Sequence, residues 1–396
     1  MILSILDTDL YKFTTSYAYM KLYPNAVGTF EYVDRNSTVY DKDFLELLQD
    51  ELSALDYAAL TPHELMQIKK NKWLTRFLPW AYWEWLSQFR FNPSKIKLEL
   101  DKCGHLHIRV TDYLYKVTLY EVPILYTVSE AYYHYKQIEP DEELMCKNLE
   151  EKIEFANREN LIFSEFGTRR RFSSEIHEKV IEYIKDNSKT CVGTSNVKFA
   201  LDYDMMPCGT FPHEWVMFHG AIWGYQQANE LSMRDWVRCY DGDLGTVLVD
   251  TYTTKFFLSQ FSRKYSKLFD GPRIDSGDEK VLGDMFIEHY KSMNINPLSK
   301  TLVMSNALTF PKFKEIRDYF AGRINVVAGI GTNITNDCGV IPLNEVMKLI
   351  EVQENWNSPK LPCIKRSDDT GKRLGSIVQH NILDIVLENA SQININ

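Results

Sequence analysis

The chain has 396 residues, of which 44% are hydrophobic and 13% aromatic, and its formal net charge is −9. A chain of this length can bury a large core, and the usual size of domains predicts two of them. The acidic balance argues against general nucleic-acid binding, which needs a basic surface. The sequence has neither an apolar run of roughly 20 residues nor a signal-peptide pattern, so it predicts a cytoplasmic protein that does not span a membrane.

The seven cysteines are scattered along the chain and show no paired CxxC spacing. This odd number without a metal-type spacing predicts reduced structural thiols rather than disulfides or a zinc site.

The first third of the chain predicts an α+β layer. Residues 43–90 contain helical segments rich in Trp and Tyr, whereas residues 96–121 alternate apolar and polar positions as strands do. A turn at Cys103-Gly104 separates two such runs, which predicts an antiparallel hairpin. The last fifty residues have the same irregular style as this first third.

Between residues 190 and 335 the chain repeats a short apolar run, a polar or glycine-rich stop and a helical stretch six times. The stops that end the six runs are Gly193 to Asn196, Gly209 to His213, Asp250-Thr251, Arg273 to Asp278, Ser305-Asn306 and Gly329 to Asn333. A further strand candidate at residues 162–167 gives about seven βα units, close to the eight of the familiar barrel. Strands that alternate with helices predict a parallel α/β sheet, because parallel neighbours need a crossover connection. Ligands of such sheets lie beyond the carboxyl ends of the strands, where the polar stops occur.

The segment Gly329-Ile330-Gly331-Thr332-Asn333 follows one apolar run. Its glycines allow backbone N–H groups to approach a phosphate, and Thr332 adds a hydroxyl donor. A tight turn explains the same pattern equally well. The Walker pattern GxxxxGK[ST] does not occur in the chain.

Two carboxylates, Asp275 and Asp278, surround a glycine in the segment Arg273 to Asp278. Such a pair suits ribose hydroxyls or a Mg²⁺ ion bound to a diphosphate, since hard cations take oxygen ligands. The alternative is an Asx turn that caps the next helix.

Three consecutive arginines, Arg169 to Arg171, follow the strand candidate at 162–167. They could bind an anionic substrate by forked hydrogen bonds, or form a solvated basic edge. At least one of them should point away from a site, because neighbours on an extended chain face opposite ways.

His213 stands at a strand-to-helix junction. It is not the start of a zinc-protease helix, because Met217 occupies the position of the second ligand. It could be a nucleophile or acid/base oriented by Asp250, or simply a structural histidine. Asp7, near the N-terminus, is interpreted as a helix N-cap.

Taken together, these segments resemble the nicotinate phosphoribosyltransferases, in which they occur in the same order. The segments are Asp7 to Lys12, Phe163 to Arg170, Gly193 to Asn196, His213 to Trp215, Asp250 to Tyr252, Asp275 to Asp278 and Gly329 to Thr332. The match extends to about residue 375. It implies an irregular parallel α/β barrel over residues 129–354 beside an α/β sandwich domain over residues 1–128 joined by 355–396, and a homodimer with shared active sites.

The resemblance also implies a reaction. Nicotinate and phosphoribosyl diphosphate would give nicotinate mononucleotide and diphosphate, on the route to NAD, coupled to ATP hydrolysis and assisted by Mg²⁺. His213 is similar to the histidine that ATP phosphorylates in this family, with Asp250 holding its other nitrogen.

The remaining site residues are implied in the same way. Those similar to the pyridine-binding residues are Tyr11, Phe166, Arg169, Thr194 and Ser195. Arg273 would face the pyridine carboxylate and the substrate phosphates, and Asp275 and Asp278 the ribose or Mg²⁺. Those similar to phosphate- or ribose-binding residues are Ser305, Asn306, Gly329, Gly331 and Thr332.

Ser195 carries the prediction of specificity. Relatives that use nicotinamide have Asp at this position, and that carboxylate repels an acid, whereas a hydroxyl tolerates nicotinate. Nicotinamide is therefore the alternative substrate. Four departures from the family pattern, at Asn306, Ile274, Pro212 and Asp369-Thr370, leave a non-catalytic homologue that binds phosphate ligands as a second alternative.

Overall fold

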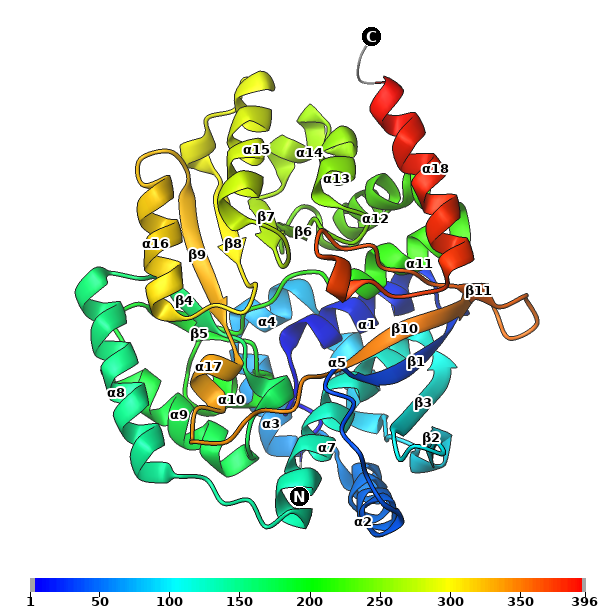
Figure 1. Cartoon of the computed structure of the whole chain (residues 1–396), viewed down its shortest axis with the longest axis vertical. Coiled ribbons are helices and arrows are strands. Elements are labelled where there is room, and N and C mark those ends of the chain that lie inside the picture. Colours follow the sequence, from blue (N-terminus) through cyan, green and yellow to red (C-terminus); the bar gives the residue numbers. More distant parts are fainter. Residues whose placement is uncertain (1–3, 394–396) are drawn as a thin grey trace. The chain divides into compact units, whose positions relative to one another are not determined.

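The computed structural model describes residues 4–393, without the side chains of 370 and 391–393. Its chain forms two compact units (Figure 1). The first contains the segment up to Tyr17, Thr29–Gly209 and Ile330–Lys348, and the second contains Ala18–Gly28, Thr210–Gly329 and the segment from Leu349 onward. The ranges predicted from the sequence, 1–128 and 129–354, divide the chain at other positions, since residues 129–209 belong to the first unit.

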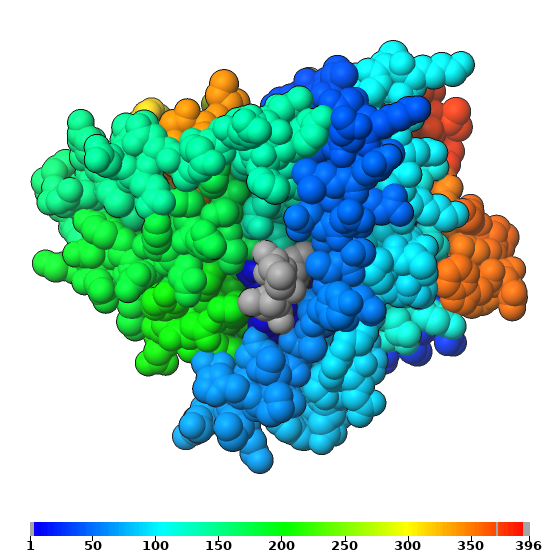
Figure 2. All heavy atoms as spheres, turned by 90° about the horizontal axis from the view of Figure 1, so that it is seen from below, coloured from blue at the N-terminus to red at the C-terminus, as the bar shows by residue number. Residues whose placement is uncertain are grey.

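The aromatic-rich region folds into helices, as the sequence predicted. The helices that lie wholly in the first unit are α2 (Lys42–Ser53), α3 (Pro62–Lys70), α4 (Lys72–Phe77), α5 (Trp80–Gln88), α6 (Leu114–Val117), α7 (Glu121–Tyr135), α8 (Glu142–Glu159), α9 (Ser174–Asn187), α10 (Val197–Asp202) and α17 (Thr332–Thr335). Ile176, Val180 and Ile184 on α9 recur every four residues and form a buried apolar stripe. Figure 2 shows the face on which segments of this unit, coloured blue to green, predominate.

The hairpin prediction is confirmed. Strands β2 (Ile96–Leu100) and β3 (Leu106–Tyr113) pair antiparallel, with Leu100 opposite Leu106. They form one edge of a five-stranded sheet with the order β11-β10-β1-β3-β2. Its other strands are β1 (Val27–Asp34), β10 (Glu345–Gln353) and β11 (Leu361–Pro362).

A second sheet contains six strands in the order β5-β4-β9-β8-β7-β6, and the described pairs within it are parallel. The strands are β4 (Phe163–Glu165), β5 (Cys191–Thr194), β6 (Thr246–Leu248), β7 (Gly271–Ile274), β8 (Thr301–Met304) and β9 (Asn325–Ile330). The predicted parallel α/β sheet is therefore present, and the polar stops do follow its strands.

The predicted number of about seven strands is too high by one. The run before Gly209 makes only an isolated bridge between Thr194 and Pro207 instead of a strand. The bridge consists of the bonds from Thr194 N–H to Met206 O and from Cys208 N–H to Thr194 O.

Helices of the second unit cover its strands. They are α11 (His213–Trp223), α12 (Tyr225–Tyr240), α13 (Thr254–Gln260), α14 (Arg263–Leu268), α15 (Glu279–Ser292), α16 (Phe310–Phe320) and α18 (Ile377–Ile393), while α1 (Leu10–Leu22) belongs partly to each unit. Helix α15 packs closely on α16 and β8 (Figure 1). Gly283 permits this close packing, because a Cβ at this position would lie 2.3 Å from Phe320 and 3.0 Å from Leu302. No helix among the described residues is long and apolar enough to cross a membrane.

The expectation that the last fifty residues are irregular is wrong for α18. Leu383 of this helix is fully buried, and the helix contacts α12 and α13. Tyr225 also donates a hydrogen bond to Gln379. Packing of one apolar face therefore stabilises a helix that the sequence pattern did not indicate.

Candidate active site

The first group of site residues is in the first unit, where the N-terminal motif meets the end of β5. Leu10 N–H donates to Ser195 O at 2.8 Å, and Val197 N–H donates to Thr8 O at 3.0 Å. Ser195 Oγ donates to Asp9 Oδ1 at 2.7 Å, and both residues are buried. Two segments more than 180 residues apart thus form one polar contact.

Burial sets the charge state of this contact. It raises the pKa of Asp9, although hydrogen bonds from Ser195 and Thr168 and the charge of Arg169 lower it. Asp9 therefore protonates more readily than an ordinary aspartate, and Ser195 faces a carboxyl group of reduced acidity.

Thr194, predicted to bind the pyridine, directs its hydroxyl at Glu165. Its side chain is fully buried, its Oγ1 donates to Glu165 Oε2 at 2.5 Å and accepts from Asn196 N–H at 3.1 Å. Glu165 also faces His177 at 3.3 Å. These bonds hold the loop that presents Ser195.

Phe166 and the glycine loop come together at the ends of β4 and β9. Phe166 N–H donates to Ile330 O at 2.8 Å, and a Cβ at Gly331 would lie 2.7 Å from Phe166 O. Only glycine fits at this approach. Thr332 begins the short helix α17 directly afterwards, as expected for the predicted phosphate loop, whereas Gly329 is the last residue of the second unit in this segment.

Tyr11 lies in the first turn of α1, beside a buried ion pair. Lys12 pairs with Glu121, and the Tyr11 hydroxyl lies 3.5 Å from Glu121 Oε1. Burial raises the pKa of Tyr11, and the Glu121 carboxylate raises it further. The phenol thus stays protonated at neutral pH.

The three consecutive arginines face different partners, as predicted for at least one of them. Arg171 is 1% exposed and forms a forked pair with Asp7, at 2.7 and 2.9 Å, plus a bond to Glu130 at 2.9 Å. Arg170 Nε donates to Glu345 O at 3.0 Å. Arg169 lies near enough to Asp9 and Tyr11 to lower the pKa of each.

The N-cap interpretation of Asp7 is wrong. Helix α1 begins at Leu10, and the Asp7 carboxylate accepts from Arg171 and, at 2.7 Å, from Asn196 Nδ2. Burial raises the pKa of Asp7, but Arg171 and Asn196 outweigh it and hold the pKa below its usual value. Asp7 is therefore a buried structural charge.

The second group of site residues is in the second unit and centres on His213. Pro212 takes the N-cap position of α11 and His213 the first helical position, while Trp215 in the same turn is fully buried. His213 Nδ1 lies 3.0 Å from Thr251 Oγ1, and Nε2 lies 2.8 Å from Lys365 Nζ. A helix start anchored in the core thus fixes the imidazole.

The charge state and tautomer of His213 follow from these contacts. Burial lowers its pKa, the ammonium of Lys365 lowers it further, and Asp250 and Asp275 do not offset the two. The imidazole is therefore neutral at pH 7. Because Nε2 accepts from an ammonium, the proton belongs on Nδ1, which donates to Thr251.

Asp250 lies on the Nε2 side of the His213 ring, whereas Thr251 lies at Nδ1. Asp250 is fully buried, with Oδ1 3.7 Å from His213 Nε2 and Oδ2 accepting from Ser276 Oγ at 2.6 Å. Its Oδ1 has no hydrogen-bond partner. Asp250 thus lies on the same side of the ring as Lys365.

Arg273, Asp275 and Ser305 form a compact group beside His213. Arg273 donates to Ser305 Oγ at 2.8 Å, to Thr210 Oγ1 at 2.9 Å and to Asp275 Oδ1 at 3.1 Å. Asp275 Oδ2 lies 3.4 Å from His213 Nε2. Burial raises the pKa of Asp275, but Arg273 and His213 lower it well below its usual value, so this carboxylate is ionised.

Asp278 does not belong to this group. It is exposed, and its Oδ1 caps α15 by accepting from the N–H groups of Lys280 and Val281. The Asx-turn alternative is therefore confirmed for Asp278. Asn306 Oδ1 accepts from Lys372 Nζ at 2.8 Å, so the departure at this position places a neutral acceptor beside a lysine.

Sequence reasoning missed Lys365 and Lys372 as site residues. Lys372 Nζ also donates to Asp275 O at 2.6 Å, and Lys365 lies 3.5 Å from Asp250 Oδ2. The departure from the family pattern at Asp369-Thr370 stands directly before Gly371-Lys372, so it was a sequence feature that could have drawn attention to Lys372. Nothing in the local sequence marked Lys365, which enters the group through the chain path after β11.

Ligand atoms of His213, Asp250 and Asp275 lie within 4.8 Å of one another. Two carboxylates, one with an unpartnered buried oxygen, are the kind of donor that Mg²⁺ shares with substrate phosphates. The residues present thus fit a Mg²⁺ ion through Asp250 and Asp275 better than through the predicted pair of Asp275 and Asp278.

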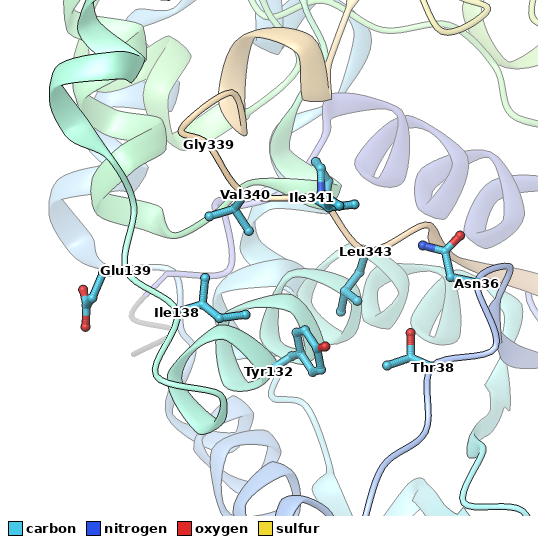
Figure 3. Close-up of a pocket in the computed structure, with 10 residues that line it drawn as sticks. Asn36, Thr38, Tyr132, Ile138, Glu139, Gly339, Val340, Ile341 and Leu343 are labelled. Atoms are coloured by element: carbon cyan, nitrogen blue, oxygen red, sulfur yellow. The ribbon is translucent and has the colours of Figure 1, made fainter.

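A pocket of about 480 Å³ lies elsewhere in the first unit (Figure 3). It is lined by segments 36–38, 132–139 and 339–343, with the side chains of Tyr132, Ile138 and Leu343 around it. None of the predicted site residues lines it.

Comparisons with known proteins indicate one family. The N-terminal domain profile of the nicotinate phosphoribosyltransferase (NAPRTase) family matches residues 6–129, and the profile of the family itself matches residues 161–389. The nicotinate phosphoribosyltransferase of Desulforapulum autotrophicum is 38% identical over 95% of this chain and 96% of its own, and that of Chromohalobacter salexigens is 36% identical over 95% of each.

Solved structures agree too. That of the Porphyromonas gingivalis nicotinate phosphoribosyltransferase has a TM-score of 0.95 at 41% identity, covering 99% of this chain and 100% of its own. The Vibrio cholerae structure has a TM-score of 0.90 at 28% identity, covering 99% and 96%. The chain therefore belongs to the nicotinate phosphoribosyltransferase family.

Proposed function

We propose that this chain joins nicotinate to phosphoribosyl diphosphate, forming nicotinate mononucleotide and diphosphate in NAD biosynthesis, in the cytoplasm. Family membership along nearly the whole chain supports the reaction. The observation that carries the choice of substrate is the Ser195 hydroxyl paired with Asp9, a carboxyl group whose pKa is raised by burial. A hydroxyl at this position adds no negative charge of its own, whereas a carboxylate there would repel an anionic pyridine carboxylate.

The residues of the second unit suit the displacement step. Loss of diphosphate from the anomeric carbon builds oxocarbenium character, so the protein has to position the pyridine nitrogen and stabilise the departing charge. Arg273, Lys365 and Lys372 supply positive charge beside Asp275. When bound, Mg²⁺ would neutralise diphosphate oxygens, and Asp250 and Asp275 are the residues that would hold it.

We further propose that ATP phosphorylates His213 at Nε2. Nδ1 keeps its proton toward Thr251, so Nε2 carries the lone pair that attacks the γ-phosphorus; the N–P bond forms, the bond to the bridging oxygen breaks and ADP leaves. A neutral imidazole needs no deprotonation for this step, and the lowered pKa of His213 keeps it neutral. Lys365 would then face the phosphoryl oxygens.

The pyridine ring is proposed to stack on Tyr11 and Phe166 contributed across a homodimer. Mixing Tyr11→Ala with Phe166→Ala protein should then restore part of the activity that each variant lacks. No recovery would contradict a shared site.

Diphosphate release by the purified protein tests the reaction. Phosphoribosyl diphosphate and Mg²⁺ are supplied with nicotinate, nicotinamide or quinolinate, each with and without ATP. Release with nicotinate, faster with ATP, is the expected result. Diphosphate release with nicotinamide but not with nicotinate would favour nicotinamide as the substrate. No diphosphate release with any of the three pyridines would favour a non-catalytic homologue.

A further inference from the structure

The turn between β2 and β3 gathers side chains of the kinds that bind transition-metal ions. They are Asp101, Cys103, His105 and His107. Ligand atoms of the first three lie within 4.8 Å of one another. Asp101 Oδ2 lies 3.1 Å from His105 Nδ1 and 3.7 Å from His107 Nε2.

The backbone holds this turn in shape. Asp101 Oδ1 accepts from the N–H groups of Cys103, at 2.8 Å, and His105, at 2.9 Å. Gly104 has φ +85°, and its carbonyl accepts from Tyr40 N–H at 2.8 Å. One carboxylate oxygen therefore fixes the turn, while the other is directed at the histidines.

Strand alternation sets both histidines on the outer face of the sheet. Leu106 and Ile108 are buried, so His105 and His107 point the other way. Exposed Glu99 is the cross-strand partner of His107. The four side chains thus converge at the surface, where an ion can reach them.

We propose that Asp101, Cys103, His105 and His107 form a binding site for a divalent ion of the zinc class, outside the proposed catalytic groups. Thiolate sulfur, imidazole nitrogen and carboxylate oxygen together make the tetrahedral donor set that Zn²⁺ prefers and Mg²⁺ does not. At ordinary zinc bond lengths, ligand atoms lie roughly 3.5 Å apart. The ligand atoms of Asp101, Cys103 and His105 therefore have to close by roughly 1 Å, and His107, whose Nε2 lies 3.7 Å from Asp101 Oδ2, has to turn toward them. Both imidazoles can turn because they are about 40% exposed.

The turn presents Asp101 in one place, because hydrogen bonds from the backbone N–H groups of Cys103 and His105 hold its carboxylate. The cysteines of the chain show no paired CxxC spacing, so local sequence did not predict a zinc site. Here the donors alternate along a hairpin, and only the turn brings them together.

Titration of the untagged, reduced, full-length protein with Co²⁺ and Zn²⁺ tests the site. Co²⁺ should produce a thiolate-to-cobalt charge-transfer band at one equivalent, and Zn²⁺ should abolish it, whereas excess Mg²⁺ should not. Cys103→Ser should remove the band and weaken Zn²⁺ binding by tenfold or more. The matched control is Cys146→Ser, which removes another exposed cysteine and should change neither.

Two further variants make the result decisive. His107→Gln should weaken binding, and His213→Ala, which disrupts the other group of potential ligands, should not. A band that survives in Cys103→Ser, equal Zn²⁺ affinity in Cys103→Ser and wild type, or no band at saturating Co²⁺ would each overturn the proposal. None of these measurements depends on enzymatic activity.

Discussion

The ammonium of Lys365 lies 2.8 Å from Nε2 of His213, and both side chains are in one buried group with Asp250. Burial and this ammonium together lower the pKa of His213. Lys365→Met should therefore raise that pKa, since the two neighbouring carboxylates remain. NMR titration of the imidazole measures the shift.

The same variant should move the acid limb of ATP-stimulated turnover to higher pH, because only the neutral imidazole is a nucleophile. Lys360→Met, which removes a lysine paired with exposed Glu351, is the matched control and should leave the profile unchanged. An unchanged His213 pKa in Lys365→Met would contradict the role of Lys365.

His213→Ala should abolish stimulation by ATP and leave slower ATP-independent synthesis, because the arginine and lysines that would stabilise diphosphate remain. Diphosphate release with and without ATP measures both rates. Thr251→Val removes the partner of Nδ1 and should reduce the stimulation only in part. Equal loss of activity with and without ATP in His213→Ala would argue against a phosphohistidine.

Ser195→Asp should shift preference toward nicotinamide, by roughly tenfold or more in the ratio of kcat/KM values, because it adds a repulsive charge against nicotinate. Ser195→Asn introduces a side chain of nearly the same size as that of aspartate but without its charge, so this variant serves as the control. The Asp9 carboxyl beside this position should also respond, with a further rise in its pKa. If both variants keep the wild-type ratio, Ser195 does not determine specificity.

Arg171→Met should destabilise the fold by about 3–5 kcal/mol, because it leaves Asp7 buried without its charge partner. Denaturant unfolding measures the loss. The double variant Asp7→Asn with Arg171→Met should recover much of it, since the buried Asp7 charge is removed and Glu130, the other partner of Arg171, is partly exposed. An equally large loss of stability in the double variant would instead indicate that the Arg171 side chain stabilises the fold by packing on Tyr126. The guanidinium carbon of Arg171 lies 4.1 Å from the centroid of the Tyr126 ring.

Glu345 gives a prediction about pH. Burial raises its pKa from 4.5 to about 8, with Ser129 donating at 2.6 Å and Tyr32 at 2.9 Å. Between these two pH values the folded state retains a proton that the unfolded state releases, so stability should fall by up to about 1.4 kcal/mol per pH unit as pH rises.

Glu345→Gln should remove this decline, so the variant should gain stability relative to wild type at pH 8 and little at pH 4.5. Unfolding midpoints at several pH values measure it, with Glu351→Gln, at a partly exposed position of the same strand, as control. Parallel pH curves for wild type and Glu345→Gln would refute the raised pKa.

Local pattern was sufficient for much of the fold. The hairpin of β2 and β3 and the buried stripe of α9 follow from periods of two and 3.6 residues, which any chain segment shows in its own sequence. The run before Gly209 was mispredicted as a strand because a short apolar run does not show its pairing partner, and in the structure this run pairs through an isolated bridge to β5. Helix α18 was missed because its stability comes from contact with α12 and α13 rather than from its own pattern.

The sequence by itself determined the family, the residue types of the site and their order along the chain, because the motifs are local and carry their own spacing. Only the tertiary structure decided which side chains meet. It set Arg171 against Asp7, turned Asp278 into a helix cap, and brought Lys365 to His213. Such pairings depend on which distant segments pack together and on which charges burial forces to find partners, and neither can be obtained from neighbouring residues.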